Sequence, residues 1–225
     1  MKVGDLRTGD ILLFSEHPSN PCDNCFVNCI KRCTSSKYSH CAYVLRWRFN
    51  LNREEIFLWE SSYHPPSVDP VDHKKNKFGV QITPLTYYTD HYPGRVDIYV
   101  RRRSRDAPTV SKYTLEDIRH SVYQKPYDIN PCDWVMAKLR CGPTNTTSRF
   151  WCSALLGYIL VKNGDITECN WSDLRAEDFS AHTRSPVHWV TKYDRDEPLE
   201  HDTHIINPLF QPRETVNPLY GFAKT

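Results

Sequence analysis

The sequence predicts an α+β protein in which an antiparallel sheet of about five strands, built from the first hundred residues, packs against helices from the second half. Two observations carry this prediction. Up to residue 101, apolar residues gather in short runs or alternate with polar ones, which is typical of antiparallel strands. From residue 114 onwards, apolar residues recur every three or four positions, which is typical of amphipathic helices.

The expected strands cover residues 11–14, 38–46, 55–62, 80–85 and 95–101. Thr8-Gly9-Asp10 has the composition of a turn before the first strand, and Pro84 is expected to end the fourth. Residues 16–24 and 63–78 contain several prolines and are expected to be loops.

Four cysteines fall between residues 22 and 33, namely Cys22, Cys25, Cys29 and Cys33. Cys22-x-x-Cys25 is half of a common zinc ligand pattern. The last three cysteines are also spaced by four, and with Phe26 and Ile30 they fit one face of a short helix. Because no second pair with metal-site spacing follows, we favour a helix core, and a metal site remains the alternative.

The expected helices cover residues 114–125, 134–139, 152–163 and 172–179. Thr114-Leu-Glu-Asp117 resembles a capping box at the start of the first, and Asn163-Gly164 gives the third a left-handed stop. From residue 194 the chain is polar, with little periodicity. We therefore expect one domain over residues 1–193 and a polar C-terminal tail over residues 194–225.

Composition and charge are those of an ordinary globular protein. Hydrophobic residues make up 39% of the chain and charged residues 25%. The formal net charge of +2 is too balanced to indicate nucleic acid as a partner. The local basic run of Arg101, Arg102 and Arg103 with Arg105 is typical of a solvated strand end. Nine cysteines, an odd number, favour reduced thiols over a complete disulfide framework.

The N-terminus has no apolar segment typical of a secretory signal. No stretch approaches the roughly 18 apolar residues that a membrane span requires. We therefore expect an intracellular, cytoplasmic protein without a transmembrane segment. The sequence does not indicate an oligomeric state.

Cys152 is the strongest candidate for a reactive residue. It stands in the first turn of the helix expected from the spacing of Leu155, Leu156 and Ile159. Unpaired amides and the positive end of the helix dipole stabilise a thiolate there, which lowers the cysteine pKa below its free value of about 8.5. The alternative is a small buried hydrophobe, as most free cysteines are.

A cysteine nucleophile needs a base, and the base needs a third polar group that fixes its orientation. His40 lies near the start of one expected strand, and Glu60 follows an apolar run in the next. A helix packed across the sheet could bring both to Cys152. Cys152 and His40 would form a thiolate–imidazolium pair, with Glu60 accepting from the far ring nitrogen. Backbone amides around Cys152 and Ser153 would then face an oxyanion.

Several motifs follow one another over roughly residues 3 to 180. They are Gly9-Asp10-Ile11-Leu12-Leu13-Phe14, Tyr38-Ser39-His40, Glu60, Gly79-Val80-x-x-Thr83-Pro84-Leu85, Lys125-Pro126-Tyr127-Asp128 and Trp151-Cys152-Ser153-Ala154-Leu155. Their order and spacing resemble the circularly permuted NlpC-type papain-like thiol hydrolases. The YiiX-like branch, which has poxviral relatives and more distant kin such as lecithin retinol acyltransferase, is the most similar.

The resemblance implies a permuted papain-like fold, in which the sheet that bears the histidine precedes the helix that bears the cysteine. It implies His40 as the base, Glu60 as its orienting partner and Cys152 as the nucleophile. It also implies that Tyr127 lines the oxyanion side. The chain departs from bacterial members in its cysteine-rich segment, its loop over residues 63–78 and its tail.

The expected activity is that of a thiol hydrolase, as in a cysteine peptidase or amidase, or of a related acyltransferase. It would attack an amide or ester carbonyl of a peptide-like or lipid acyl substrate and form a thioacyl-enzyme, with no cofactor or metal required. A lipid substrate would need an apolar groove, which residues 22–33 or Tyr87, Tyr88 and Tyr92 could line. The alternative is a structural or interaction protein, for instance a virion component, that keeps the fold.

Overall fold

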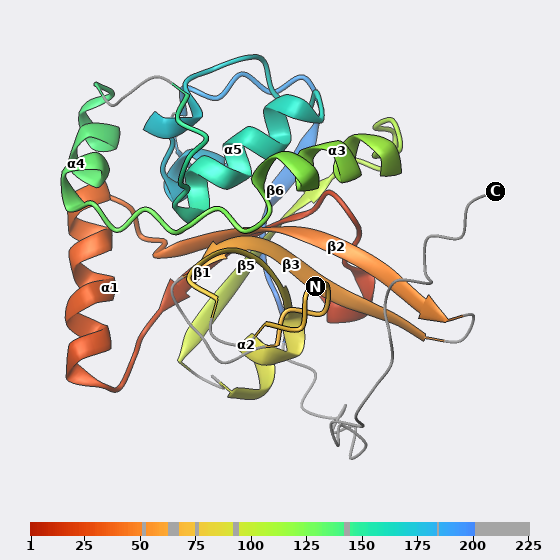
Figure 1. Ribbon diagram of the computed structural model, residues 1–225, viewed down its shortest axis with the longest axis horizontal. Coiled ribbons are helices and arrows are strands. Elements are labelled where there is room, and N and C mark those ends of the chain that lie inside the picture. The colour runs from red at the N-terminus through yellow and green to blue at the C-terminus, as the bar shows by residue number, and fades with distance from the viewer. Residues whose placement is uncertain are drawn as a thin grey trace.

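The computed structural model describes residues 1–50, 53–62, 68–74, 77–91, 95–141, 145–183 and 185–200. Within these ranges the protein is α+β, with a six-stranded antiparallel sheet (Figure 1). The strands are β1 (Ile11–Glu16), β2 (His40–Asn50), β3 (Arg53–Ser62), β4 (Gly79–Pro84), β5 (Val96–Arg103) and β6 (Tyr193–Pro198), in the order β4-β3-β2-β1-β5-β6. The predicted α+β class with an antiparallel sheet is thus confirmed.

Strand β6 was not expected. It pairs with β5 between Tyr99↔Pro198 and Arg103↔Tyr193, at the edge of the sheet. Residues 194–198 therefore belong to the sheet and not to a tail, while residues 201–225 lie outside the described residues. Tyr193 is the one buried side chain of β6, so backbone pairing rather than an apolar pattern holds the strand.

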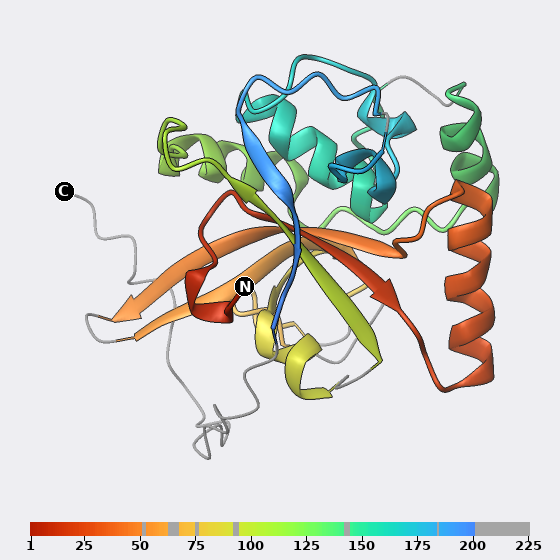
Figure 2. The same cartoon turned by 180° about the vertical axis from the view of Figure 1, so that it is seen from behind.

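Five α-helices and three 3₁₀ turns lie in the described ranges. They are α1 (Pro21–Thr34), α2 (Leu85–His91), α3 (Lys112–Val122), α4 (Pro131–Leu139), α5 (Cys152–Lys162), η1 (Val3–Asp5), η2 (Trp171–Asp173) and η3 (Ala176–Phe179). Figures 1 and 2 show α3 and α5 over one face of the sheet, α2 against the other, and α1 beside α4. The single helix expected over residues 172–179 is two 3₁₀ turns. Among the described helices none has the length and apolar composition to span a bilayer.

Helices α1 and α4 begin with the same tetrapeptide, Asn-Pro-Cys-Asp. Asn20 Oδ1 accepts from the Cys22 amide at 3.0 Å, and Asn130 Oδ1 accepts from the Cys132 amide at 3.1 Å. The proline that follows each asparagine suits the first helical position because it has no N–H to leave unpaired. These polar caps start α1 inside the loop expected over residues 16–24, and they start α4 before residue 134.

The sheet separates two apolar cores because successive side chains of a strand point to opposite faces. Leu13, Cys41 and Tyr43 face the core under α5, whereas Phe14 and Val44 face the core against α2. Helix α5 is the centre of the first core, since every residue from Cys152 to Leu160 is buried.

The arginine run on β5 is structural, so the expectation of a solvated strand end is wrong for Arg101 and Arg103. Both side chains are buried because their positions on β5 point into the helix-covered core. Arg101 Nη1 donates to the Phe179 carbonyl at 2.7 Å, and Arg103 forms a 2.9 Å ion pair with Asp165. Buried charges need such partners.

Candidate active site

His40 and Glu60 form a buried pair on the neighbouring strands β2 and β3. His40 Nε2 lies 2.6 Å from Glu60 Oε2. Glu60 is 1% exposed and His40 7% exposed, so the pair is shielded from water. The His40 ring packs against Phe14 and Tyr88, with centroids 5.3 and 6.2 Å away. Two residues proposed from the sequence as base and orienting partner therefore lie in direct contact.

Glu60 accepts hydrogen bonds from three further side chains. Its Oε1 accepts from the Thr83 hydroxyl at 2.6 Å and from Gln81 Nε2 at 3.3 Å, and its Oε2 accepts from the Tyr88 hydroxyl at 2.8 Å. Because these groups are donors, Glu60 is the acceptor toward His40 as well. The His40 Nε2 then carries a proton, which leaves Nδ1 as the ring nitrogen for another partner.

The ionisation of Glu60 reflects this arrangement. Burial is the largest influence and by itself would raise the pKa of Glu60. The positive charge and hydrogen bond of His40, with hydrogen bonds from Thr83 and Tyr88, outweigh burial and lower the pKa of Glu60 below its usual value. Glu60 is therefore a carboxylate at neutral pH.

Cys152 is the first residue of α5 and interacts with two adjacent residues of β2, His40 and Cys41. The hydrogen bond from the Cys41 side chain has the largest influence on its ionisation. Burial acts in the opposite direction, but the hydrogen bond and positive charge of His40 add to the effect of Cys41. The pKa of Cys152 is therefore well below its usual value.

The pKa of His40 moves the other way. Burial is the largest influence and disfavours the imidazolium. Hydrogen bonds to Cys152 and Glu60, together with their negative charges, outweigh burial and raise the pKa of His40 well above its ordinary value. A lowered cysteine pKa beside a raised histidine pKa describes a thiolate–imidazolium pair.

A small pocket of about 30 Å³ opens beside Cys152. Its walls are Ile30 and Thr34 of α1, Tyr38 and Ser39, Tyr127, Trp134 and Ala137 of α4, Trp151 and Ser153, and Leu174 and Ala176. Most of these side chains are apolar or aromatic, so the pocket suits an apolar group next to the sulfur. Cys152 lines the pocket, whereas His40 and Glu60 are not among the residues of its walls.

Gly79 brings Tyr127 to the pocket. The Val80 amide donates to the Lys125 carbonyl at 2.9 Å, and the Tyr127 amide donates to the Phe78 carbonyl at 3.1 Å. Gly79 has φ +142°, and a Cβ at this position would overlap the Lys125 carbonyl oxygen. Glycine is therefore required for the close approach of these two segments.

Phe150 connects the same segment to Cys152. The Phe150 amide donates to the Pro126 carbonyl at 3.1 Å, and the Phe150 carbonyl accepts from the Asp128 amide at 3.1 Å. The Ser61 hydroxyl donates to that carbonyl at 2.6 Å. These bonds fix the chain two residues before Cys152 against the end of β3.

Ser153, expected on the oxyanion side, has a structural side chain. Its hydroxyl donates to the Leu174 carbonyl at 2.7 Å, and Trp151 Nε1 donates to the same oxygen at 3.3 Å. The backbone amides of Cys152 and Ser153 are in the first turn of α5, where no helical carbonyl lies four residues before them. Any oxyanion role of Ser153 therefore belongs to its amide.

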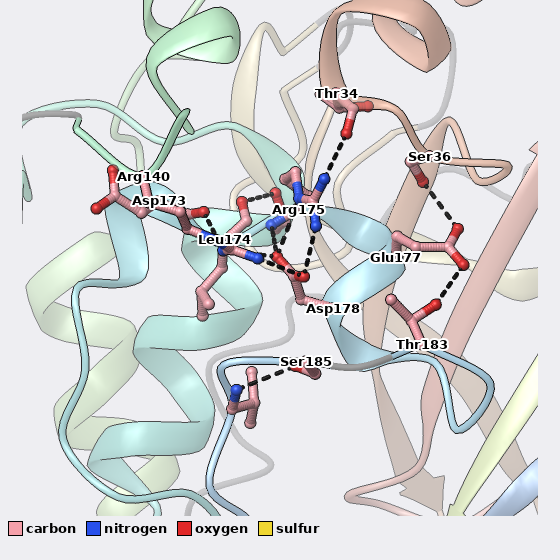
Figure 3. A network of polar contacts seen from close by, with 12 residues as sticks. Thr34, Ser36, Arg140, Asp173, Leu174, Arg175, Glu177, Asp178, Thr183 and Ser185 are labelled. Carbon is pink, nitrogen blue, oxygen red and sulfur yellow. Dashed lines mark hydrogen bonds and ion pairs between the residues drawn. The ribbon is translucent and has the colours of Figure 1, made fainter. Parts of the chain in front are cut away.

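A network of charges holds the pocket wall between η2 and η3 (Figure 3). Asp178 is fully buried and pairs with Arg140 at 2.8 Å and with Arg175 at 3.0 Å. Arg175 Nη1 also donates to the Thr34 carbonyl at 2.9 Å. The end of α4, the turn η3 and the end of α1 are thus joined through one carboxylate.

The helix face expected from Cys25, Phe26, Cys29, Ile30 and Cys33 is buried only in part. Ile30 lies in the core and Phe26 and Cys33 pack against it, but Cys25 and Cys29 are exposed, because α1 buries Val27 together with Ile30. Cys29 Sγ and Cys33 Sγ are 3.7 Å apart. In the part of the chain that the structure describes, no three His, Cys, Asp or Glu side chains converge as metal ligands would.

Of the two segments suggested to line an apolar groove, residues 22–33 contribute to the pocket, whereas Tyr87 and Tyr88 do not. Ile30, within residues 22–33, lines the pocket beside Cys152. Tyr87 and Tyr88 are buried in the core on the α2 side of the sheet, so they do not line this pocket. Tyr92 lies outside the described residues.

Residues of the site that sequence reasoning missed include Cys41 and Tyr88. Strand alternation was the available signal for Cys41, because a residue next to His40 must face the opposite side of the sheet, where α5 packs. Tyr88 lies on α2, a helix that the sequence does not predict because Pro84 is expected only to end the strand before it.

Searches with protein-family models and among curated proteins return no match for this chain.

Proposed function

We propose that the protein is a cysteine hydrolase with a permuted papain-like fold, which cleaves an amide or ester bond through a thioacyl-enzyme. The single observation that supports this most is the position of His40. It lies between a buried carboxylate, Glu60, and a cysteine at a helix N-terminus, Cys152. A nucleophile, its base and the group that orients the base are thereby in one chain of contacts.

In the first half of the proposed reaction, the Cys152 thiolate attacks the carbonyl carbon of a substrate bound in the pocket. The new S–C bond moves the carbonyl electron pair onto oxygen, and the amides of Cys152 and Ser153 donate to that oxyanion. The His40 imidazolium gives its proton to the leaving nitrogen or oxygen as the bond to carbon breaks. A thioester on Cys152 and neutral His40 remain.

The second half releases the acyl group. Neutral His40 takes a proton from water, and the hydroxide that forms attacks the thioester carbonyl. The tetrahedral intermediate then expels the Cys152 thiolate, which restores the ion pair. Glu60 keeps the His40 ring in place through both halves and stabilises each imidazolium. An alcohol or amine in place of water would make the protein an acyltransferase.

The lining of the pocket supports an apolar group beside the scissile carbonyl. Trp134 and Ala137 come from α4, and Ile30 comes from α1. Because the pocket is small, the group nearest the carbonyl would be a short aliphatic segment. An acyl chain or an apolar amino-acid side chain has this shape, so peptide-like and lipid acyl substrates both remain within the proposal.

The test is acylation by an activated ester. The purified protein is mixed with p-nitrophenyl butyrate, release of p-nitrophenol is followed, and the intact mass and peptides of quenched samples locate the butyryl group. We expect a burst with the adduct on Cys152, and none there in Cys152→Ala. His40→Gln keeps a donor for Glu60 but removes the base, and it should slow acylation at least 100-fold.

Cys25→Ser is the matched control, because it removes an exposed thiol of α1 and should leave the burst unchanged. Butyrylation spread evenly over several cysteines, or a rate that His40→Gln does not alter, would contradict the proposal. Those results would instead favour the structural or interaction protein that the sequence left as the alternative.

A further inference from the structure

Two thiols near the end of α1 lie in contact. Cys29 Sγ and Cys33 Sγ are 3.7 Å apart. The two residues are one helical turn apart, and residues four positions apart share one face of a helix. Cys29 is exposed and Cys33 is half-buried. The pair is therefore a dithiol that a reagent in solution reaches from the Cys29 side.

The same turn of α1 forms part of the pocket wall. Ile30 and Thr34 line the pocket beside Cys152. Ile30 directly follows Cys29, and Thr34 directly follows Cys33. One turn of backbone thus carries the dithiol on one side and the pocket wall on another, so a change in the shape of this turn changes the pocket.

Contacts before and after this turn hold it in place. Before it, the Phe26 ring packs edge-on against Trp134 of α4, with centroids 5.7 Å apart. After it, the Thr34 carbonyl accepts from Arg175 Nη1 at 2.9 Å (Figure 3). Because both ends are held, a contraction of the turn moves the residues between them, including Ile30, and does not simply slide the helix.

A disulfide between Cys29 and Cys33 would require such a contraction. The Cβ atoms of residues four positions apart on a helix are about 5–6 Å from each other, whereas a disulfide brings its two Cβ atoms to about 3.5–4.5 Å. The outer side of the turn would therefore shorten by roughly 1–2 Å and bow the Ile30 side toward the pocket. The pocket holds only about 30 Å³, so a shift of this size narrows it appreciably.

We propose that Cys29 and Cys33 form a redox site that reacts with low-molecular-weight disulfides such as glutathione disulfide, and that the resulting bond narrows the pocket at Cys152. One cysteine thiolate attacks a sulfur of glutathione disulfide and expels one glutathione. The second cysteine thiolate attacks the mixed disulfide and expels the other glutathione. Two cysteine thiols are thus oxidised to one disulfide, one glutathione disulfide is reduced to two glutathiones, and the two protons pass to the departing thiolates.

The test compares the reduced and the oxidised full chain. Protein is incubated with glutathione disulfide, freed of it by gel filtration and mapped by mass spectrometry without reduction, and Cys152 is then alkylated with iodoacetamide. The rate constant reflects only the Cys152 thiols that remain free, so glutathione bound to a fraction of Cys152 does not alter it. We expect a Cys29–Cys33 disulfide and at least a threefold slower alkylation of Cys152, both reversed by dithiothreitol.

In Cys29→Ser, oxidation should leave the alkylation rate of Cys152 unchanged because the bond has lost one partner. Cys25→Ser is the matched control, since it removes another exposed thiol of α1 four residues from Cys29 and should respond to oxidation as the wild type does. Mixed disulfides with glutathione in place of the Cys29–Cys33 bond, or a bond that leaves the Cys152 rate unchanged, would overturn the inference.

The formation of the bond is independent of the proposed function, whereas control of hydrolysis by it rests on that function. The two fail in different experiments. The proposed function fails if the reduced protein gives no burst with p-nitrophenyl butyrate, and the inference fails on the disulfide map or on the alkylation rate of the oxidised protein.

Discussion

His40 Nε2 and Glu60 Oε2 are 2.6 Å apart, and three other donors already hold the Glu60 carboxylate in place. The orientation of the His40 ring is thus fixed by the sheet and α2 and does not depend on a bound substrate. In the proposed reaction, a base oriented in this way would avoid the entropic cost of ordering the ring.

Replacing Glu60 by glutamine tests this relationship. The amide has nearly the size of the carboxylate but carries no charge, so it no longer stabilises the His40 imidazolium. The positive charge of His40 that stabilises the Cys152 thiolate is then smaller on average. We therefore expect the midpoint of Cys152 alkylation to rise by about one to two pH units. Glu54→Gln, the same change at the surface end of β3, is the control. If the alkylation midpoint is unchanged in Glu60→Gln, Glu60 does not contribute to the reactivity of Cys152.

Tyr88→Phe removes one donor to Glu60 and keeps the ring that packs on His40. A hydrogen bond to a buried carboxylate contributes roughly 1.5–3 kcal/mol, so the free energy of unfolding should fall by about 2 kcal/mol. Urea denaturation measures the change. Tyr113→Phe, at a tyrosine that is 82% exposed, should have almost no effect. Equal stability of the two variants would argue against a structural contribution from the Tyr88 hydroxyl.

Gly79→Ala tests how Tyr127 is brought to the pocket. A Cβ at φ +142° would meet the Lys125 carbonyl, so backbone strain and overlap should lower the free energy of unfolding by about 2 kcal/mol or more. Acylation of Cys152 should slow as the pocket wall shifts. Gly4→Ala is the matched control because no heavy atom lies within 4 Å of its added carbon. Full stability and activity in Gly79→Ala would show that a side chain fits between Gly79 and the Lys125 carbonyl.

Asp178→Ala tests the network behind the pocket. Removing Asp178 leaves the charges of Arg140 and Arg175 without their carboxylate partner. The free energy of unfolding should therefore fall by about 3 kcal/mol. Glu116→Ala, which breaks a surface pair with Arg119, should cost less than about 1 kcal/mol. Urea denaturation measures the free energy of unfolding of both variants. Equal losses would show that the Asp178 network contributes no more to stability than a surface ion pair.

The same carboxylate gives a pH dependence of stability. Burial would raise the pKa of Asp178, but hydrogen bonds from Arg140 and Arg175 lower it below its usual value of 3.8. A carboxyl with a depressed folded-state pKa stabilises the protein above its unfolded pKa and loses that contribution as the pH falls through the folded one. Asp178→Ala should therefore lose stability less steeply than the wild type below pH 4.

The elements of this fold that apolar patterns define were predictable from the sequence. The start of β1, the core of β3 and most of α5 fall where the apolar runs placed them. Strand β6 was missed because its residues are polar and its pairing uses the backbone, which leaves no trace in side-chain periodicity. The early starts of α1 and α4 were missed because asparagine caps, and not apolar residues, set them.

The candidate site was predictable from the sequence to the extent that its residues lie near strand ends and at a helix start. His40, Glu60 and Cys152 each occupy such a position, and chemistry limits which residue types serve there. The supporting residues were beyond prediction because they depend on register. Gln81 and Thr83 reach Glu60 only when β4 pairs with β3 as observed, and Tyr88 needs the turn into α2.

We propose that Cys152 is a thiolate at neutral pH because of its neighbours. The pH dependence of iodoacetamide alkylation at Cys152 in the full chain measures this most directly. Because a lowered pKa moves ionisation to more acid pH, the midpoint of the rate should lie well below the value of about 8.5 of a free cysteine. A rate that still rises about tenfold per unit between pH 6 and pH 8, as an ordinary thiol's does, would contradict the account.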